Sequence, residues 1–313
     1  MTTRLARALS FLAVLLVGYG ASLAVTSKVG YAGRPILAYL SQHLLEPGGE
    51  HQTLRRFREA EGRDPVDVVF FGSSHAYRGF DPRLFAEAGY TSQNLGSTNQ
   101  TPLNSVYLAR RYLARLSPRL VIVEIYYATL AGDGFESTRD LLVNTTWAWE
   151  MQAMAFATHQ LGAINFGAAK GLGLLGDLSG VEQRVIPTER YVAGGYCETT
   201  RVRRTLDDRL PFRVTLEPQQ LDELVRLSEI GAAAGARVLW VSHPLPADHL
   251  RALENRAAIH HTIRETAERA GVVYRSYEDL DLDPLADFFD FHHLNAHGVE
   301  RFNRALLADL ERP

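Results

Sequence analysis

Residues 65–75 read P-V-D-V-V-F-F-G-S-S-H, and this stretch decides the fold. Apolar residues run from Val66 to Phe71, broken only by Asp67, and Pro65 and Gly72 bound the run. The run is too short for a domain-spanning helix, and its near-continuous apolarity is typical of a strand that is buried on both faces. Strands of this kind belong to parallel sheets with helices on either side. The stretch therefore predicts an α/β protein.

Further segments along the chain alternate between strand and helix patterns. Strand patterns occupy residues 90–95, 119–126, 236–241 and 272–274. Helical patterns occupy residues 81–89, 102–116, 217–234 and 246–270, and a last helix follows Asn295. Strands that alternate with helices form parallel sheets with right-handed crossovers. Five such strands predict a flavodoxin-like three-layer α/β/α sandwich.

The first 30 residues form a separate unit with the properties of a membrane anchor. Residues 8–25 carry no charge, and Arg4 and Arg7 precede them. Eighteen apolar residues are about enough to cross a bilayer as a helix, and the basic flank predicts that the N-terminus stays in the cytoplasm. A cleavable signal peptide is the alternative, because residues 22–24 are suited to a cleavage site. We expect an uncleaved anchor in the cytoplasmic membrane, with the rest of the chain on the periplasmic or extracellular side.

The remaining residues divide into a connector and one large domain. Residues 31–63 have a helical, increasingly charged pattern and predict a connector. The α/β domain occupies residues 64–313, and an insertion at residues 128–216 interrupts its alternation. Within the insertion, residues 145–175 are rich in Ala, Gly, Met and Trp and predict one or two helices. We expect the insertion to cap one end of the sheet.

The composition limits the partners and the kinds of site. The net charge is −3, so no overall field attracts the chain to nucleic acid. The single cysteine, Cys197, cannot form an internal disulfide or a cysteine-based zinc site. We interpret it as a structural residue.

Polar residues follow each of the five predicted strands. Ligands of open parallel sheets bind outside the carboxyl ends of the strands. In strand order, the residues that fall at this edge are Ser74, Gly96, Tyr126, His243, and the pair Asp290 and His293. All of them are therefore expected on one edge of the sheet.

Three of these residues have the chemistry of a serine-type acyl hydrolase or transferase. A serine hydroxyl such as that of Ser74 is a poor nucleophile until a base removes its proton. His293 can be that base, because imidazole titrates near neutral pH. Asp290, three residues earlier, would hold the ring and stabilise its cationic form.

The neighbouring His and Asp residues fit these roles less well. His292 has the wrong spacing from Asp290, and His297 lies within the last helix, so we expect a solvated role for each. Asp287 also lacks the three-residue spacing. Asp287, Asp290, His292 and His293 have the ligand chemistry of a metal site, but nothing outside their loop offers an obvious further anchor. We therefore expect neither a metal ion nor a cofactor.

The motifs resemble blocks of the SGNH/GDSL hydrolase superfamily. These are Gly72-Ser73-Ser74, Asn94-Leu95-Gly96 and Asp290-x-x-His293-Leu294-Asn295, and the resemblance covers residues 64–126 and 236–310. It implies that Ser74 is the nucleophile and that Asp290 and His293 complete the triad. Ser73 replaces the usual Asp, a change familiar in membrane-anchored envelope members similar to the D-alanyl-transfer and polysaccharide O-acetylation proteins.

One part of the family pattern is missing. We expect the backbone N–H groups of Ser74 and Gly96 to stabilise the oxyanion, because Gly allows close approach. The family usually adds an Asn side chain after the third strand, but residues 124–128 read E-I-Y-Y-A. Asn99 or Tyr126 are the candidate substitutes. Pocket roles are open to His75, Tyr126 and His243, although a structural role suits His75 better and His243 equally well.

The resemblance and the anchor together imply an extracytoplasmic serine esterase or O-acyltransferase. Its expected substrate is an O-acyl ester, by analogy that of a cell-envelope or exported polysaccharide. Other envelope-biosynthesis proteins are expected as partners, and nucleic acid is not. The alternative is a non-catalytic binding or scaffold subunit of an envelope assembly, which the missing Asn and the anchor both allow.

Overall fold

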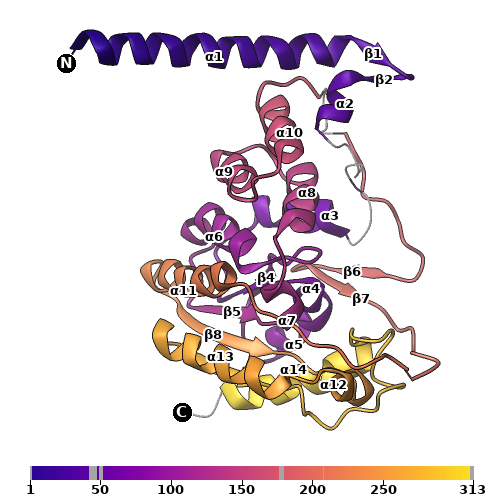
Figure 1. Ribbon diagram of the computed structural model, residues 1–313. Coiled ribbons are helices and arrows are strands. Elements are labelled where there is room, and N and C mark those ends of the chain that lie inside the picture. The colour runs from indigo at the N-terminus through magenta and orange to yellow at the C-terminus, as the bar shows by residue number, and fades with distance from the viewer. Residues whose placement is uncertain (1, 42–47, 49–51, 176–179, 207, 311–313) are drawn as a thin grey trace.

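The computed structural model describes residues 2–41, 48, 52–175, 180–206 and 208–310. Its centre is a five-stranded parallel sheet with the order β4-β3-β5-β8-β9 (Figure 1). The strands are β3 (Val68–Phe71), β4 (Ser92–Asn94), β5 (Leu120–Glu124), β8 (Arg237–Ser242) and β9 (Val273–Ser276). The first of them lies second in the sheet and the next in sequence lies outside it, which is the flavodoxin-like order. The predicted fold is confirmed.

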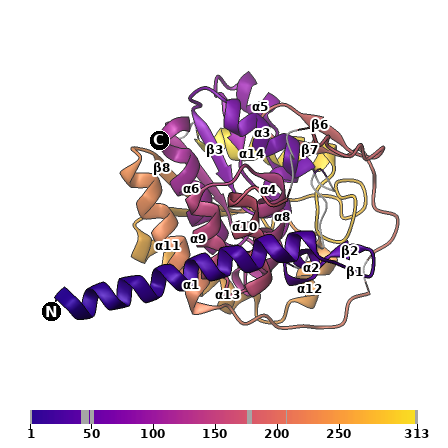
Figure 2. The same ribbon diagram turned by 90° about the horizontal axis from the view of Figure 1, so that it is seen from above.

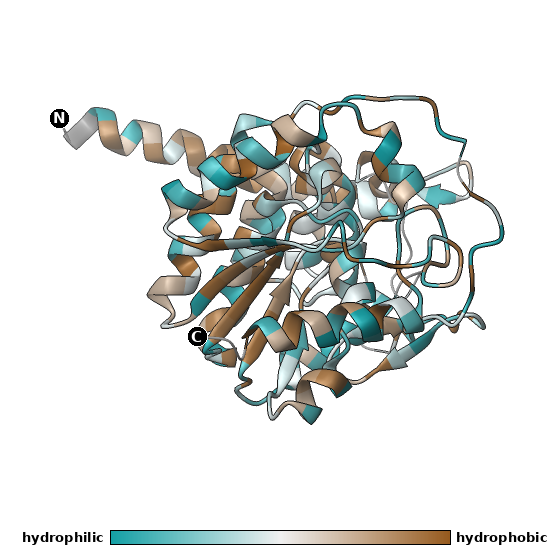
Figure 3. Cartoon of the chain, turned by 90° about the horizontal axis from the view of Figure 1, so that it is seen from below, coloured by the Kyte–Doolittle hydropathy of each residue, from teal (hydrophilic) through white to brown (hydrophobic). Residues whose placement is uncertain are grey.

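Burial on both faces explains why these segments form strands. Every residue of β3 and β5 is buried. In β3, Val69 and Phe71 belong to the apolar core on one side of the sheet, and Val68 and Phe70 belong to the core on the other side. Successive side chains of a strand point to opposite faces, so a strand between two cores must be apolar throughout. Figure 3 shows the strands as a predominantly brown, hydrophobic centre.

Helices cover both faces of the sheet. One core includes residues of α6 (Pro102–Leu116), α11 (Pro218–Ala233) and α13 (Arg256–Ala270). The other core includes residues of α4 (Ser74–Gly79), α5 (Pro82–Glu87) and α14 (Ala296–Leu310). The prediction of a single long helix at residues 246–270 is wrong, because the structure has two helices in this range.

Two helices occupy that range, α12 (Ala247–Ala252) and α13. Phe212, near the end of the insertion, causes the break. Its N–H donates to the carbonyl of Ala252, and its carbonyl accepts from the N–H of Glu254. The side chain of Asn255 adds two hydrogen bonds to the backbone of Val214. These bridges take backbone groups that a continuous helix would use internally.

The N-terminal region starts with α1 (Thr2–Lys28). The segment of this helix from Arg4 to Lys28 is long enough and apolar enough to cross a membrane. Length and composition alone do not distinguish such a helix from a signal sequence. The expected connector does not begin as a helix. It begins as a small hairpin, and the helices α2 and α3 follow. The elements are β1 (Gly30–Tyr31), β2 (Arg34–Pro35), α2 (Ile36–Leu40) and α3 (Thr53–Gly62). Residues 42–47 and 49–51 lie outside the described residues.

The insertion consists of helices followed by a hairpin. Its elements are α7 (Tyr127–Leu130), α8 (Phe135–Asn144), α9 (Trp149–Ala157), α10 (Leu161–Gly171), β6 (Arg190–Val192) and β7 (Tyr196–Glu198). The expected helices at residues 145–175 are thus α9 and α10. Helix α9 packs on α6 and α8 packs on α3, so these helices stack between the domain and α1 (Figures 1 and 2). The part of the insertion that contacts α4 is strand β7.

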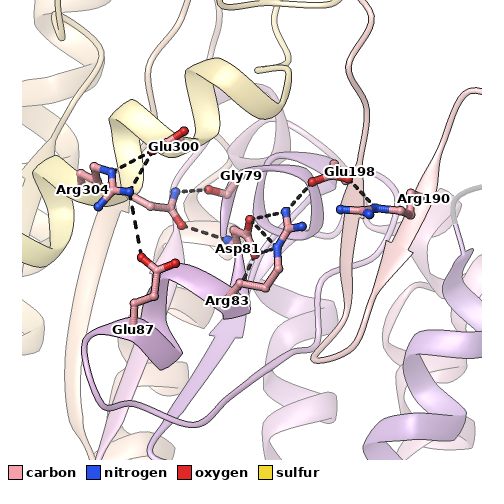
Figure 4. Close-up of polar contacts among 9 residues, drawn as sticks. Gly79, Asp81, Arg83, Glu87, Arg190, Glu198, Glu300 and Arg304 are labelled. Atoms are coloured by element: carbon pink, nitrogen blue, oxygen red, sulfur yellow. Dashed lines mark hydrogen bonds and ion pairs between the residues drawn. The ribbon is translucent and has the colours of Figure 1, made fainter.

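A polar network fixes the hairpin and the end of α4 (Figure 4). Arg83 pairs with Asp81, which caps α5, and with Glu198 of β7. On the other side, Asn303 of α14 accepts a hydrogen bond from the N–H of Asp81 at 2.9 Å. Its amide donates to the carbonyl of Gly79 at 2.6 Å. The network thus connects α14 to Gly79 and Asp81 at the end of α4, and it connects α5 to strand β7 through Arg83.

Candidate active site

The structure brings Ser74, His293 and Asp290 together at the carboxyl edge of the sheet. Ser74 Oγ lies 2.7 Å from His293 Nε2, although the two residues are 219 positions apart. His293 Nδ1 lies 2.8 Å from Asp290 Oδ2. Serine, imidazole and carboxylate are thus connected in the order that nucleophilic catalysis by serine requires.

The turn after β3 presents the Ser74 hydroxyl. Gly72 has φ +145°, and a Cβ atom there would lie 2.6 Å from side-chain atoms of Glu124. Ser73 caps α4, because its Oγ accepts a hydrogen bond from the N–H of His75 at 3.2 Å. Ser74 is the first residue of α4, where a helix offers the N–H no internal partner. This N–H therefore suits the predicted role as an oxyanion donor.

The loop before α14 holds the imidazole. Asp290 Oδ1 accepts hydrogen bonds from the N–H groups of His292 and His293 at 2.9 and 2.8 Å, and Oδ2 binds the ring of His293. Burial acts to raise the pKa of Asp290, but these contacts outweigh it, so the pKa lies well below its ordinary value. Burial lowers the pKa of His293. A neutral imidazole beside an ionised carboxylate is the state that a general base needs.

Asp287, the rival carboxylate, serves a different part of the loop. It is fully buried and accepts hydrogen bonds from His297 Nδ1 at 2.5 Å and Arg301 Nη1 at 2.6 Å. A third bond comes from the N–H of Asp283 at 2.8 Å. These contacts join the loop to α14. The choice of Asp290 by spacing agrees with this geometry.

Two predicted oxyanion donors do not agree with the structure. The N–H of Gly96 donates to Asn94 Oδ1 at 2.9 Å, because the Asn94 side chain closes the turn after β4. Asn99 is exposed, and its amide donates to Glu136 Oε2 at 3.2 Å. The predictions for Gly96 and Asn99 are therefore wrong, and the Ser74 N–H is the remaining one of the three.

A cluster of aromatic rings lies beside the triad. The ring of His75 lies 4.2 Å from that of Tyr126 and 3.7 Å from that of His243, measured between centroids. His75 Nε2 lies 2.8 Å from His292 Nδ1, and the ring of His292 lies 3.7 Å from that of His293. The three candidate pocket residues are thus adjacent. The solvated role expected for His292 is wrong, because its ring nitrogen is engaged by His75.

Glu124, the last residue of β5, is a site residue that was not predicted from the sequence. Its Oε2 accepts hydrogen bonds from Ser73 N at 2.8 Å and Ser73 Oγ at 3.0 Å, so it supports the turn that carries Ser74. Burial raises the pKa of Glu124 to about 7. The signal was present in the sequence, because Glu124 is the one charge in the apolar run L-V-I-V-E-I-Y.

Among the residues that the structure describes, two groups of side chains have donor atoms close enough to share a metal ion. One group is His75, Glu124 and His243, and the other is His75, His292 and His293. In each group the donor atoms lie within 4.8 Å of one another. The second group overlaps the triad, since His293 uses one ring nitrogen for Ser74 and the other for Asp290.

An open groove of about 730 Å³ adjoins Asp290. Its walls are the loop from Thr200 to Leu206, Arg209, and the residues Phe289–Phe291. The N–H of Arg203 donates to the carbonyl of Phe288 at 2.8 Å, which holds the loop against the segment of the triad. The groove gives a substrate room beside the reacting groups.

The similarity of this chain to known proteins is weak. No protein-family model matches the chain, and no curated protein matches it. Among solved structures, the chain is similar to one described as an acylhydrolase from Bacteroides fragilis, with 15% identity and a TM-score of 0.43 over 83% of this chain and 97% of that chain. A GDSL-like lipase from Bacteroides thetaiotaomicron shows 13% identity and a TM-score of 0.42 over 83% and 100%. For TesA the identity is 14% and the TM-score is 0.41, over 78% of this chain and 98% of that chain.

These likenesses have TM-scores below 0.5, so the assignment of chemistry to this chain depends on the geometry of the site.

Proposed function

We propose that this chain is a serine esterase or O-acyltransferase with Ser74 as its nucleophile. The observation that carries the proposal is the continuous hydrogen-bonded chain from Ser74 Oγ through His293 to Asp290, at 2.7 and 2.8 Å. A serine that is merely part of a polar turn does not need an imidazole at hydrogen-bonding distance with a carboxylate behind it. The triad geometry therefore favours an enzyme over the scaffold alternative.

The proposed reaction has two steps. Ser74 Oγ attacks the ester carbonyl while its proton passes to His293 Nε2, and the oxyanion faces the N–H of Ser74. Collapse of this intermediate breaks the bond to the leaving alcohol, which takes the proton from His293, and the acyl group stays on Ser74. Water or a sugar hydroxyl then attacks the acyl-enzyme and gives its proton to His293, which returns it to Ser74. Asp290 stabilises the cationic imidazole in both steps.

The substrate proposed is an O-acyl ester of a cell-envelope or exported polysaccharide. The groove beside Asp290 supports an extended substrate, because it is open and larger than a small ester needs. Phe291, 42% exposed, offers a surface for a sugar ring, and the exposed Arg201 and Arg204 offer donors for hydroxyl or acidic groups. Hydrolysis and transfer differ only in whether water or a sugar hydroxyl accepts the acyl group, so the assay includes both acceptors.

Exposure of the purified full-length chain to a fluorophosphonate probe tests the proposal. The wild-type protein is expected to become covalently labelled, and His293→Ala is expected to label far more slowly. A panel of acyl esters with and without polysaccharide acceptors then separates hydrolysis from transfer. A well-folded wild-type protein that resists labelling contradicts the enzyme and favours a binding or scaffold subunit.

We further propose that α1 is retained as an anchor with the domain on the extracytoplasmic side. Leu23 of α1 is buried, in a cluster with Leu37 and Ala169. Tyr19 Oη donates to Asn165 Oδ1 at 2.7 Å. Cleavage of a signal peptide near Ala24 would remove both contacts, which supports an uncleaved helix.

Apolar side chains on α9 and α10 support placement of this end of the domain at the membrane surface. Trp149 and Phe156 lie seven residues apart, on one face of α9, and are 74% and 54% exposed. Leu161 of α10 and Leu172, which directly follows this helix, are 75% and 56% exposed. Helix α10 contacts α1, and α9 packs against α10 (Figure 1). Tryptophan at the edge of a bilayer is typical of membrane-bound proteins.

This placement predicts contact between Trp149 and lipid. In vesicles that contain the full-length chain and lipids with brominated acyl chains, the tryptophan emission is expected to be quenched. Trp147 is partly exposed and its ring lies 5.1 Å from that of Trp149, so the measurement uses chains in which Trp147 is replaced by Phe. In that background, Trp149→Phe is expected to remove most of the quenching, because Trp240, the third tryptophan, is fully buried and stays out of reach of the lipid. Quenching of Trp149 by aqueous iodide, without quenching by brominated lipid, would contradict the placement.

A further inference from the structure

Three buried side chains meet directly behind the turn that carries Ser74. His75 follows β3, Glu124 ends β5 and His243 follows β8, so three neighbouring strands deliver them to one point. Their exposed fractions are 1%, 4% and 2%. Within the described part of the chain, Glu124 Oε1 and His243 Nε2 are buried without a hydrogen-bond partner. Burying two such atoms without partners is costly, so the arrangement needs an explanation.

We propose that His75, Glu124 and His243 bind one divalent metal ion, with Zn²⁺ as the best match. The donor atoms of the three residues lie within 4.8 Å of one another, and His75 Nδ1 lies 3.7 Å from Glu124 Oε1. Zinc bonds of about 2.1 Å in a tetrahedral site place donors about 3.4 Å apart. The widest pair therefore has to close by no more than about 1.4 Å when the ion binds.

The donor set explains the choice of metal. Two imidazoles and one carboxylate form a set that zinc takes in proteins, whereas calcium and magnesium prefer oxygen ligands alone. A cation beside Glu124 Oε1 would balance its buried charge and give His243 Nε2 a partner. The other oxygen of Glu124 already accepts two hydrogen bonds from Ser73. Hydrogen bonds of this kind orient the carboxylate ligands of metal sites.

A metal at this point would also fix the neighbouring imidazoles. If His75 binds the ion through Nδ1, its Nε2 must carry the proton and donate to His292 Nδ1, which lies 2.8 Å away. The ring of His292 in turn packs against that of His293. The ion would therefore stabilise the turn of the nucleophile and the position of the base, as a positioning element that does not touch the substrate.

The site is separate from the triad, which keeps the proposal distinct from the esterase proposal. The alternative ligand group of His75, His292 and His293 would require His293 to release Ser74 or Asp290. The two groups share only His75. Removal of His293 therefore distinguishes between them.

Elemental analysis of the purified full-length protein tests the proposal. After incubation with Zn²⁺ and dialysis, we expect about one zinc per chain. Glu124→Gln preserves the shape of the side chain and His243→Ala removes a ligand, and each is expected to lower the zinc content at least tenfold. His293→Ala is the matched control, because it should abolish ester hydrolysis and retain the zinc.

Two further measurements keep the result clear if a variant folds poorly. Titration of the wild-type protein with Co²⁺ is expected to give a saturable visible absorption band at one ion per chain, and Zn²⁺ is expected to displace it. A chelator is expected to lower the melting temperature of the wild-type protein. Absence of zinc, of the cobalt band and of the chelator effect in the wild type would overturn the proposal. Loss of zinc in His293→Ala would overturn it as well, because the ion would then belong to the triad.

Discussion

Replacing Ser74 with alanine is expected to abolish fluorophosphonate labelling and to lower kcat for ester hydrolysis by about 10⁴- to 10⁶-fold. The variant loses the atom that forms the acyl-enzyme, so neither His293 nor Asp290 can contribute to that route. In related triads, removal of the serine costs about as much as removal of all three residues. The measurement is covalent labelling together with hydrolysis of an activated ester.

Ser73→Ala is the matched control, because Ser73 is the adjacent serine on the same turn. The Ser73 hydroxyl caps α4 and donates a hydrogen bond to Glu124. The hydroxyl that lies 2.7 Å from His293 Nε2 is that of Ser74. The control protein is expected to remain covalently labelled, with a moderate loss of stability from the missing cap, about 1 kcal/mol. Labelling that persists in Ser74→Ala and disappears in Ser73→Ala would reverse the assignment of the nucleophile.

Asp290→Asn is expected to lower kcat by about 10⁴-fold while the protein stays folded. The amide is uncharged, so it does not stabilise the cationic form of His293, and its N–H₂ group favours the wrong tautomer of the ring. Asp290 is half-buried, and the oxygen of an Asn side chain can still accept the hydrogen bonds from the N–H groups of His292 and His293, so the fold is expected to persist. Hydrolysis rates and a thermal melt of the same sample measure both effects.

Asp287→Asn is the contrasting variant in the same loop. Asp287 is fully buried and pairs with Arg301 and His297, so loss of its charge is expected to destabilise the protein by about 3 kcal/mol. The folded fraction should retain its rate, because the contact between Asp290 and His293 is untouched. If Asp287→Asn abolished hydrolysis without loss of stability and Asp290→Asn did not, the orienting carboxylate would be Asp287.

The sequence predicted the fold because the strands carry strong local signals. Buried parallel strands must be apolar on both faces, and β3 and β5 are unmistakable in this respect. The placement of Ser74 and His293 at one edge followed from the rule for parallel sheets. The spacing of Asp290 from His293 then selected the pair whose ring nitrogen and carboxylate the structure places at 2.8 Å.

The errors concern contacts that no local pattern encodes. Gly96 and Asn99 were suitable donors by residue type, but Asn94 and Glu136 compete for them in space. The partnership of Glu124 with Ser73 joins residues 51 positions apart, and that of His75 with His292 joins residues 217 apart. The break between α12 and α13 depends in the same way on Phe212, which arrives from the insertion. Such pairings become visible only after the sheet order is known.

The positions of Ser74 and His293 along the chain determine when the proposed activity can arise during folding. The nucleophile lies near the start of the domain, and its base lies 219 residues later, just before the final helix. During synthesis Ser74 emerges first, without the imidazole that would remove its proton. The proposed reactivity therefore requires the segment before the C-terminal helix to dock, so the last folding step would complete the triad. A chain that is truncated before residue 290 would be inert, however much of the sheet it had formed.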